Sequence, residues 1–309
     1  MRLIAAFIMR GRWQAMVATA GLAILALLLM PLSWPLSYLS GGVVGLVTLV
    51  QGPKEGVLNA AGAILLVAVL AMLLVGQPTV AAGFAVMLWM PAWLLAIVLY
   101  LSRSQALMLL VNVLLAMASV IVVFALVPDP AQWWHTYLAG EVIPMLKQAG
   151  MVIPDEAAFM AGLETASRLM TGAMVASISF GLAMSLITAR WWQAVVGNRP
   201  GAFGEEFRAL RLGRIAASAA VLLSLLMLFI QGTLAELSLN LLEVMIIAFM
   251  FQGLAVGHAL AHQFKANQAW LVMMYIVMIF TLPYGLLLVA LVGVLDNGFD
   301  FRARFRPRA

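Results

Sequence analysis

The stretch AELSLNLLEVMIIAFMFQGLAVGHALAH, residues 235–262, has the apolar character of a membrane helix and yet carries acids, amides and histidines. About 20 apolar residues cross the hydrocarbon core of a bilayer, so the stretch is long enough. Ionisable groups at membrane depth are costly, and by default they indicate a functional site. Glu236, Asn240 and Glu243 are spaced i, i+4 and i+7, so they share one helix face. The stretch therefore predicts a membrane helix with candidate functional side chains.

Two interpretations of this polar face are open. In the first, the three side chains line the interior of a helix bundle as a relay for protons or cations. In the second, which we favour, Glu236 lies at the outer interface and only Glu243 is buried, paired with a single partner. We retain Glu243 and Asn240 as substrate-binding or relay candidates.

His258 and His262 are spaced i, i+4 near the other end of the stretch, and two imidazoles on one face can share a metal ion. A third ligand would have to come from elsewhere, and the pair lacks the adjacent glutamate of the metalloprotease motif. Histidines are also favoured near the C-terminus of a helix by its dipole. We therefore favour a structural role for this pair and expect no metal site and no cofactor.

The composition of the whole chain agrees with a membrane protein. Of its 309 residues, 65% are hydrophobic and only 9% are charged, whereas soluble domains carry about 25% charged residues. The chain has no cysteine, which excludes disulfides, iron–sulfur clusters, thiolate metal sites and a cysteine nucleophile. The net charge of +5 comes largely from arginines in a few loops and the tail. Such a pattern is typical of topology signals, so we expect the lipid bilayer and no nucleic acid as a partner.

Apolar runs recur along the chain and predict an all-α, polytopic membrane helix bundle with about 8–9 hydrophobic segments. The predicted segments are 13–30, 36–50, 57–75, 81–101, 106–127, 169–188, 215–230, 238–260 and 270–295. We treat 1–309 as a single membrane domain. It consists of a six-helix part (1–190), a basic loop (191–214), additional membrane helices (215–295) and a basic tail (296–309).

Residues 128–168 differ from the rest of the chain because acids and prolines interrupt them. Trp133 and Trp134 form an aromatic cluster that is typical of a membrane boundary. We predict two short interfacial helices here, at about 131–148 and 155–167.

Arginine and lysine near the ends of the spans favour a cytoplasmic N-terminus and an inner-membrane location. This topology places the arginines of 190–214 inside and the acidic segment 128–168 outside. Nine crossings, however, would leave the basic tail outside, against the same rule. The segment 270–295 is therefore either a re-entrant hairpin, broken at Pro283, that returns the tail to the cytoplasm, or a kinked full span. Both alternatives stay open.

Residues 31–40 (PLSWPLSYLS), the short glycine-rich span that follows and the turn Gly52-Pro-Lys-Glu-Gly56 resemble the start of the substrate-binding S components of energy-coupling-factor vitamin transporters. Together with the ending GVLD (293–296) and FDFR (299–302), these features also look like the YybS-like family of bacterial multi-pass membrane proteins. The second resemblance covers most of the chain but implies no particular activity. The first implies a six-helix binding fold, and the chain departs from it after residue 214.

Other polar residues in or near the spans are weaker candidates. Asn59 and Asn112 are either interhelical hydrogen-bond partners, which we favour, or substrate ligands. Lys54 and Glu55 in the Gly-Pro turn are either a cytoplasmic contact for a partner or, as we favour, a solvated ion pair. The arginines of the basic loop and tail are predicted to contact anionic lipid or a partner protein at the cytoplasmic face. These are Arg208, Arg211, Arg214, Arg302 and Arg304.

Three functional classes compete. The features above favour a transporter-like or small-molecule-binding membrane subunit, because intramembrane polar groups and a broken last helix are typical of transporters. The alternative is a non-catalytic scaffold that recruits a membrane protein partner through its basic segments. We do not expect an enzyme, since no phosphate-binding loop or nucleophile elbow is visible and no carboxylate pair is supported as catalytic.

Overall fold

The computed structural model describes residues 2–151 and 155–305, and all the regular structure in that part of the chain is helical. The first half contains α1 (Arg2–Ile8), α2 (Arg12–Leu28), η1 (Met30–Leu32), α3 (Ser33–Gln51), α4 (Pro53–Val75), α5 (Val80–Phe84), η2 (Ala85–Trp89), α6 (Met90–Ser102) and α7 (Gln105–Leu126). The second half contains α8 (Pro130–Tyr137), η3 (Leu138–Val142), α9 (Ile143–Gln148), α10 (Glu156–Val196), α11 (Ala202–Arg208), α12 (Arg214–Phe229), α13 (Thr233–Gln263), α14 (Gln268–Phe280), α15 (Tyr284–Phe299) and α16 (Phe301–Arg304).

Six helical segments are long and apolar enough to cross a membrane, which agrees with the predicted class of helical membrane protein. They are Met30–Gln51, Pro53–Leu74, Val80–Ser102, Gln105–Leu126, Ala157–Val196 and Thr233–Gln263. The other predicted segments correspond to four shorter apolar helices, α2, α12, α14 and α15. Large apolar side chains are exposed along the long helices, for example Leu65 and Leu73 on α4 and Leu114 on α7, and a bilayer would cover them.

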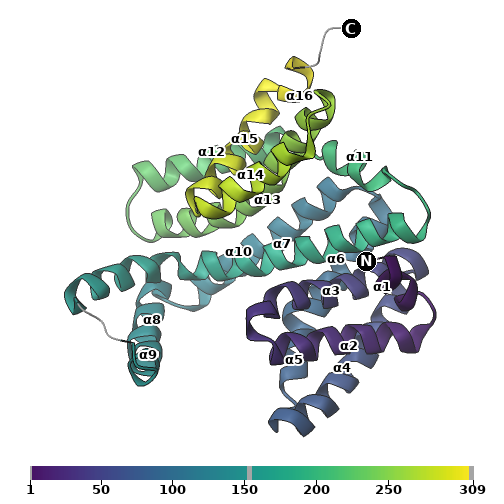
Figure 1. The fold of residues 1–309 in the computed structure, drawn as a ribbon. Coiled ribbons are helices and arrows are strands. Elements are labelled where there is room, and N and C mark those ends of the chain that lie inside the picture. The colour runs from purple at the N-terminus through teal and green to yellow at the C-terminus, as the bar shows by residue number, and fades with distance from the viewer. Residues whose placement is uncertain (1, 152–154, 306–309) are drawn as a thin grey trace.

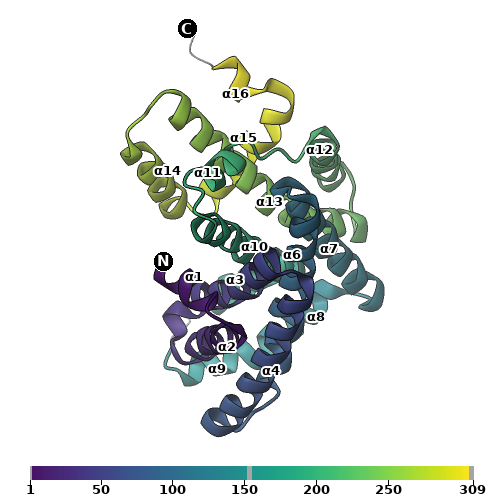
Figure 2. The ribbon, with the colours of Figure 1, turned by 90° about the vertical axis from the view of Figure 1, so that its right-hand side faces the viewer.

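The helices form two groups on either side of a central pair. Helices α7 and α10 lie between α1–α6 and α12–α16 (Figures 1 and 2), and both contact α13. In Figure 2, α13 lies between α12 and α14. The longest helix, α10, packs against α3 of the first group and α13 of the second, so it joins the two halves.

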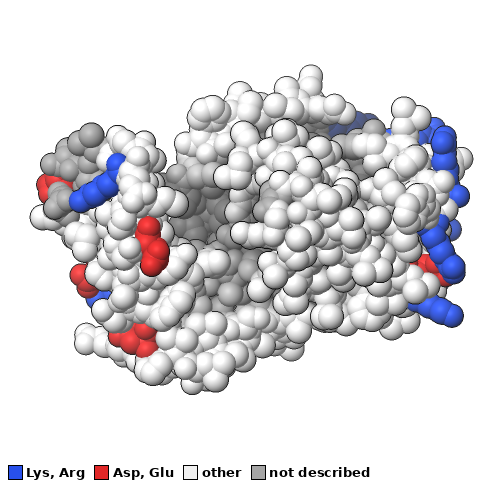
Figure 3. All heavy atoms as spheres, turned by 90° about the horizontal axis from the view of Figure 1, so that it is seen from below, with Lys and Arg blue, Asp and Glu red and all other residues white. Residues whose placement is uncertain are grey.

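The charged residues gather at opposite ends of the molecule, with a band of uncharged surface between them (Figure 3). The exposed acids of one end are Asp129, Glu141, Asp155 and Glu164. The other end carries the arginines of the segments near 103, 190–214 and 302. We name these the acidic end and the basic end. Helix α10 begins at the acidic end and finishes at the basic end (Figure 1).

Of the two short helices predicted in this segment, the first is confirmed as a helical stretch and the second is wrong as a separate helix. Residues 130–148 are helical throughout, as α8, η3 and α9. Residues 155–167, in contrast, are the first turns of the 41-residue helix α10. Asp155 begins that helix by accepting a hydrogen bond from the Ala158 amide at 2.9 Å. The fall in hydropathy near Arg168 does not end the helix, because Arg168 pairs with Glu164 one turn earlier at 3.0 Å.

Helix α3 was the shortest predicted span, yet ten consecutive residues, Ser40–Leu49, are all buried. Its glycines allow a close approach to α10. A Cβ added at Gly41 would lie 2.6 Å from the Ser185 hydroxyl oxygen, and one added at Gly45 would lie 2.8 Å from the Ala189 Cβ. Small residues at such contacts let two helix backbones pack tightly in lipid.

The last apolar segment is broken where proline and glycine predicted it. Helix α14 runs back along α13, because Tyr275 of α14 contacts His258 of α13. After Thr281–Pro283 the chain reverses, and helix α15 returns beside α13 (Figure 1). Gln263, at the end of α13, donates a hydrogen bond to the Arg302 carbonyl at 3.0 Å. The two halves therefore form a hairpin, and the described part of the tail lies at the basic end.

Candidate functional site

The asparagines that the sequence singled out join helices to one another. The Asn59 amide donates to the Thr19 hydroxyl at 3.0 Å, between α4 and α2. The Asn112 amide donates to the Ser179 carbonyl at 2.9 Å and to its hydroxyl at 3.0 Å, between α7 and α10. All four side chains are buried, and these are interhelical bonds of the kind expected inside a bilayer.

The polar face of α13 is turned toward α10. Asn240 accepts from the Gly172 amide at 2.6 Å and donates to the Arg168 carbonyl at 2.9 Å. Glu236 lies 4.0 Å from the Arg168 guanidinium near the acidic end. Glu243 lies against Gly172, and its Oε2 is buried with no hydrogen-bond partner among the described residues. The single partner expected for Glu243 is thus not seen at this oxygen.

The two histidines are separated by their environments. His258 Nε2 lies 2.8 Å from the Tyr275 hydroxyl, and its ring packs edge-on against Phe207. His262 is exposed. Within residues 2–151 and 155–305, no group of three His, Cys, Asp or Glu side chains could hold a metal ion.

Glu55 pairs with a residue other than its neighbour in the turn. Its carboxylate accepts from Arg12 Nε at 2.7 Å, and this contact ties the start of α4 to the start of α2. The predicted solvated pair of Lys54 and Glu55 is replaced by this interhelical pair.

The tail is fastened to the basic loop by a buried ion pair. Arg302 donates to Asp296 Oδ2 at 2.6 Å, and only 8% and 0% of the two side chains are exposed. The same guanidinium donates to the carbonyls of Arg208 and Leu210 at 2.7 and 2.9 Å. Gln252 of α13 donates to Asp296 and accepts from the Leu212 amide. We call this network of Asp296, Arg302, Gln252 and the carbonyls of 208 and 210 the tail clasp.

The prediction that Arg302 contacts lipid or a partner protein is wrong. Its guanidinium is buried and bound within its own chain, so it is available to neither. Arg211 forms an exposed ion pair with Asp300, and Arg214 Nε lies 3.5 Å from the Asn297 carbonyl. Arg208 is half-buried, and Arg304 is exposed beside the Phe299 ring. Of the five predicted arginines, Arg302 is therefore buried and Arg211 is paired with Asp300, while Arg214 and Arg304 stay exposed.

The exposed ion pair of Arg211 and Asp300, at the edge of the tail clasp, also changes the pKa of its acid. The Arg211 guanidinium, which donates a hydrogen bond to Asp300, holds the pKa of that carboxyl below its usual range. The Ala303 amide, which also donates to Asp300, acts in the same direction.

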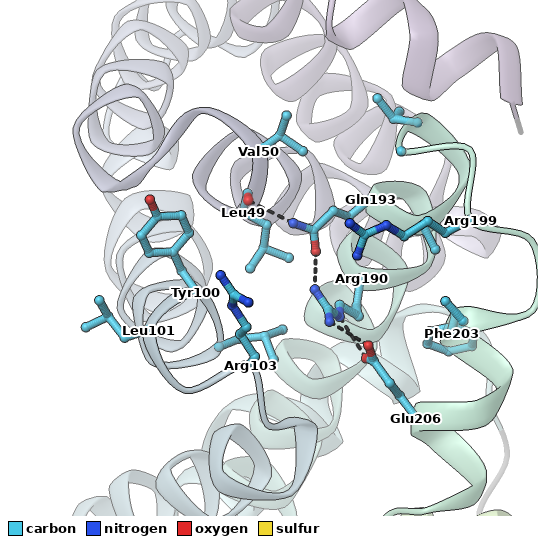
Figure 4. A pocket seen from close by; sticks show the side chains of 15 residues that line it. Leu49, Val50, Tyr100, Leu101, Arg103, Arg190, Gln193, Arg199, Phe203 and Glu206 are labelled. Carbon is cyan, nitrogen blue, oxygen red and sulfur yellow. Dashed lines mark hydrogen bonds and ion pairs between the residues drawn. The ribbon is translucent and has the colours of Figure 1, made fainter.

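A different set of arginines lines a cavity of about 590 Å³ at the basic end (Figure 4). The ends of α3, α6 and α10 and the start of α11 form its walls. Arg103, Arg190 and Arg199 point into it from three separate positions (Figure 4), and we call it the arginine pocket. Glu206 is the one acid among the described lining residues, so these four side chains carry a formal charge of +2.

Arg190 is already engaged within the arginine pocket. It donates to both Glu206 oxygens, at 2.8 and 2.6 Å, in the bidentate geometry that favours arginine and carboxylate. It also donates to Gln193, which in turn donates to the Leu49 carbonyl at the end of α3 at 2.8 Å. Gln105 of α7 donates to Glu206 at 3.2 Å. This network fixes the wall of the pocket.

Arg103 and Arg199 are not engaged in this way. Both are exposed, and in the described part of the chain no hydrogen bond or ion pair holds either guanidinium. Arg103 ends α6 with a left-handed backbone (φ 54°), which a residue other than glycine adopts only when its surroundings impose it. The sequence showed these arginines only as topology signals, and nothing in it indicated that three of them would meet.

A second cavity, of about 490 Å³, lies at the start of α3, whereas the arginine pocket lies at the end of that helix. It is lined by the starts of α3 and α5 and the middle of α10, including Tyr38, Phe84 and Ser177. A hollow is visible beside the acidic end in the space-filling view (Figure 3). We call this cavity the outer cleft.

Helices α3 and α10 run parallel, and their contacts keep one register. Gly181 lies against the Tyr38 ring, Gly41 against Ser185, Gly45 against Ala189, and Gln193 bonds to Leu49. We name this contact the α3–α10 seam. The outer cleft lies at its first level and the arginine pocket at its last, about 16 Å apart at 1.5 Å per residue. The glycine contacts close the levels between them.

Comparisons with protein families, with curated proteins and with solved structures give no match to this chain.

Proposed function

We propose that the protein is a transporter-like membrane subunit that binds a small anionic molecule and passes it along the α3–α10 seam. The observation that carries this proposal is the pair of cavities at opposite ends of one seam, with a closed contact between them. A path that is open at one end at a time needs two such cavities and a contact that can separate. The positive charge of the arginine pocket supports an anion as the ligand.

For a molecule to pass, the closed middle of the α3–α10 seam, between the two cavities, would have to open. We call this part of the seam the seal. Ser185 is fully buried there, and its hydroxyl oxygen lies 2.9 Å from the carbonyl oxygens of both Tyr38 and Gly181, so its single hydrogen is donated to one or the other. Glycine and alanine contacts hold no side-chain interlock, so two helices can separate without breaking ion pairs. The scaffold alternative relied on the arginines of the loop and tail, and Arg302 among them is buried.

Cysteine labelling tests this function directly, because the chain has no cysteine of its own. We expect S177C in the outer cleft to react with a membrane-impermeant maleimide from the acidic side only, and A194C in the arginine pocket from the basic side only. S185C should react slowly from both sides as the seam opens.

A matched control is a lock across the seam. G45C and A189C together place two thiols within disulfide reach, and oxidation should abolish the reaction of S185C. If S185C stays unlabelled from both sides while S177C and A194C react, the seam does not open and the transport function is rejected.

We further propose eight membrane crossings, by α2, α3, α4, α5–α6, α7, α10, α12 and α13, in the bacterial inner membrane with the basic end in the cytoplasm. The hairpin of α14 and α15 would not cross. Reporters inserted in the 208–214 loop and after Phe305 should then both be active on the cytoplasmic side. Activity on opposite sides would contradict this topology.

A further inference from the structure

The arginine pocket has two guanidinium groups, of Arg103 and Arg199, that form no ion pair with any described residue, and it has an exposed apolar rim. We propose that it binds an amphiphilic molecule with a terminal phosphate monoester, the phosphate between Arg103 and Arg199 and the hydrocarbon part on the rim. This inference rests on the proposed function, since it names the class of molecule that the same pocket would take.

The charge count of the pocket selects the phosphate. Glu206 neutralises Arg190 through two hydrogen bonds, which leaves the charges of Arg103 and Arg199 unpaired. A phosphate monoester carries about −1.5 to −2 at pH 7 and offers three acceptor oxygens, whereas a phosphodiester carries a single charge. Two planar guanidinium groups can each bind such a phosphate through a pair of hydrogen bonds. A monoester therefore matches the pocket in charge and a diester does not.

The rim selects an amphiphile. Leu101 is 73% exposed, and Tyr100 and Val50 beside it are 43% and 40% exposed. These residues end the membrane helices α6 and α3, so they lie where the hydrocarbon core of a bilayer meets its headgroups. A hydrocarbon chain lying there would cover apolar surface while its phosphate reaches the arginines. Basic pockets between membrane helices on the cytoplasmic side bind lipid headgroups in this manner.

The test is isothermal titration of the full-length protein in detergent micelles with dioctanoyl phosphatidic acid. We expect phosphatidic acid to bind about tenfold more tightly than dioctanoyl phosphatidylglycerol, whose diester lacks one charge. Inorganic phosphate should bind more weakly than phosphatidic acid, because it gains nothing from the rim. R103Q/R199Q should weaken the binding of phosphatidic acid about 100-fold, since two charge-assisted contacts are lost.

The matched control is R214Q/R304Q, which removes the same charge from exposed arginines at the same end but outside the pocket. It should change the affinity less than twofold. Protection of A194C from maleimide by phosphatidic acid provides a second measurement that needs no arginine substitution.

The outcomes separate the inference from the function on which it rests. Equal affinity for phosphatidic acid and phosphatidylglycerol, equal effects of the two double variants, or no protection of A194C would overturn the phosphate monoester. Inorganic phosphate binding as tightly as phosphatidic acid would overturn the amphiphile and leave a soluble anion as the ligand. In each case the labelling of S185C still decides whether the seam opens.

Discussion

Arg302 of the tail clasp and two arginines of the arginine pocket, Arg103 and Arg199, lie at the same end of the molecule and differ in how they are bound. Arg302 is buried and fixes the tail through three hydrogen bonds, two to the backbone carbonyls of Arg208 and Leu210 and one to the Asp296 carboxylate. Arg103 and Arg199 are exposed and face a cavity, and no described residue forms an ion pair with either guanidinium. The same residue type thus stabilises the fold in one place and leaves charge available for a ligand in the other.

The difference shows that the density of charge along a sequence does not reveal how the charge is used. The loop and tail are rich in arginine and attracted the prediction of a partner surface, yet Arg302 is bound by Asp296 and backbone carbonyls and Arg211 by Asp300. The arginines of the pocket are scattered over nearly 100 residues, and only the fold brings them together.

The largest effect should come from breaking the tail clasp. R302M leaves the buried Asp296 carboxylate without its counter-charge, and loss of one partner of a buried pair costs about 3–5 kcal/mol. Chemical unfolding in detergent micelles measures this loss. The matched change R304M, two residues along and exposed, should stay within about 0.5 kcal/mol of wild type. Equal effects of the two variants would remove the distinction between clasp and surface arginines.

The arginine pocket depends on the close packing of α3 and α10 in the seam that leads to it. G45L forces α3 away from α10, and overpacking of this kind costs about 1–3 kcal/mol. The unfolding free energy should fall accordingly, and S185C should become more reactive because the seal is disrupted. G21L is the control, since a Cβ at Gly21 meets nothing within 4 Å. A neutral G45L with unreactive S185C would show that the seam is not a close contact.

The pocket arginines should contribute almost nothing to stability. R103Q/R199Q removes two charges that no internal partner holds, so the unfolding free energy should change by less than about 0.5 kcal/mol. The same chemical unfolding experiment measures the change. A loss comparable to that of R302M would mean that these arginines are structural, and the contrast between the two sets would fail.

The smallest effect concerns the exposed pair of Arg211 and Asp300. Because the folded pKa of Asp300 is lowered, its contribution is present at neutral pH and is lost as the pH falls through that lowered pKa. D300N should therefore lower the melting temperature slightly at pH 7, and the difference from wild type should vanish in acid. Asparagine also caps helices, so the start of α16 is preserved. A difference that grows in acid would contradict this sign.

Much of the fold follows from the sequence. Apolar runs of about 20 residues predicted the helical membrane class, and six of the structure's helical segments meet that criterion. The break at Pro283 was predicted from the residues themselves, and the conflict between the basic tail and nine crossings favoured the hairpin that α14 and α15 form. Asn59 and Asn112 make the interhelical bonds that amides in a bilayer require.

What the sequence could not supply depends on contacts between distant segments. The separate helix predicted at 155–167 failed because a polar surface on a helix looks like a boundary in hydropathy, although Asp155 and Glu164 extend α10. The burial of Arg302 requires carbonyls near residue 210, which is 92 positions away. The arginine pocket requires the α3–α10 register, which no local pattern encodes.

Single-particle imaging of the full-length protein with phosphatidic acid tests the central claim most directly. The account predicts density for a phosphate within hydrogen-bond distance of Arg103 and Arg199, with its hydrocarbon part against Leu101. Phosphate density beside Arg214 and Arg304, with none in the arginine pocket, would contradict it.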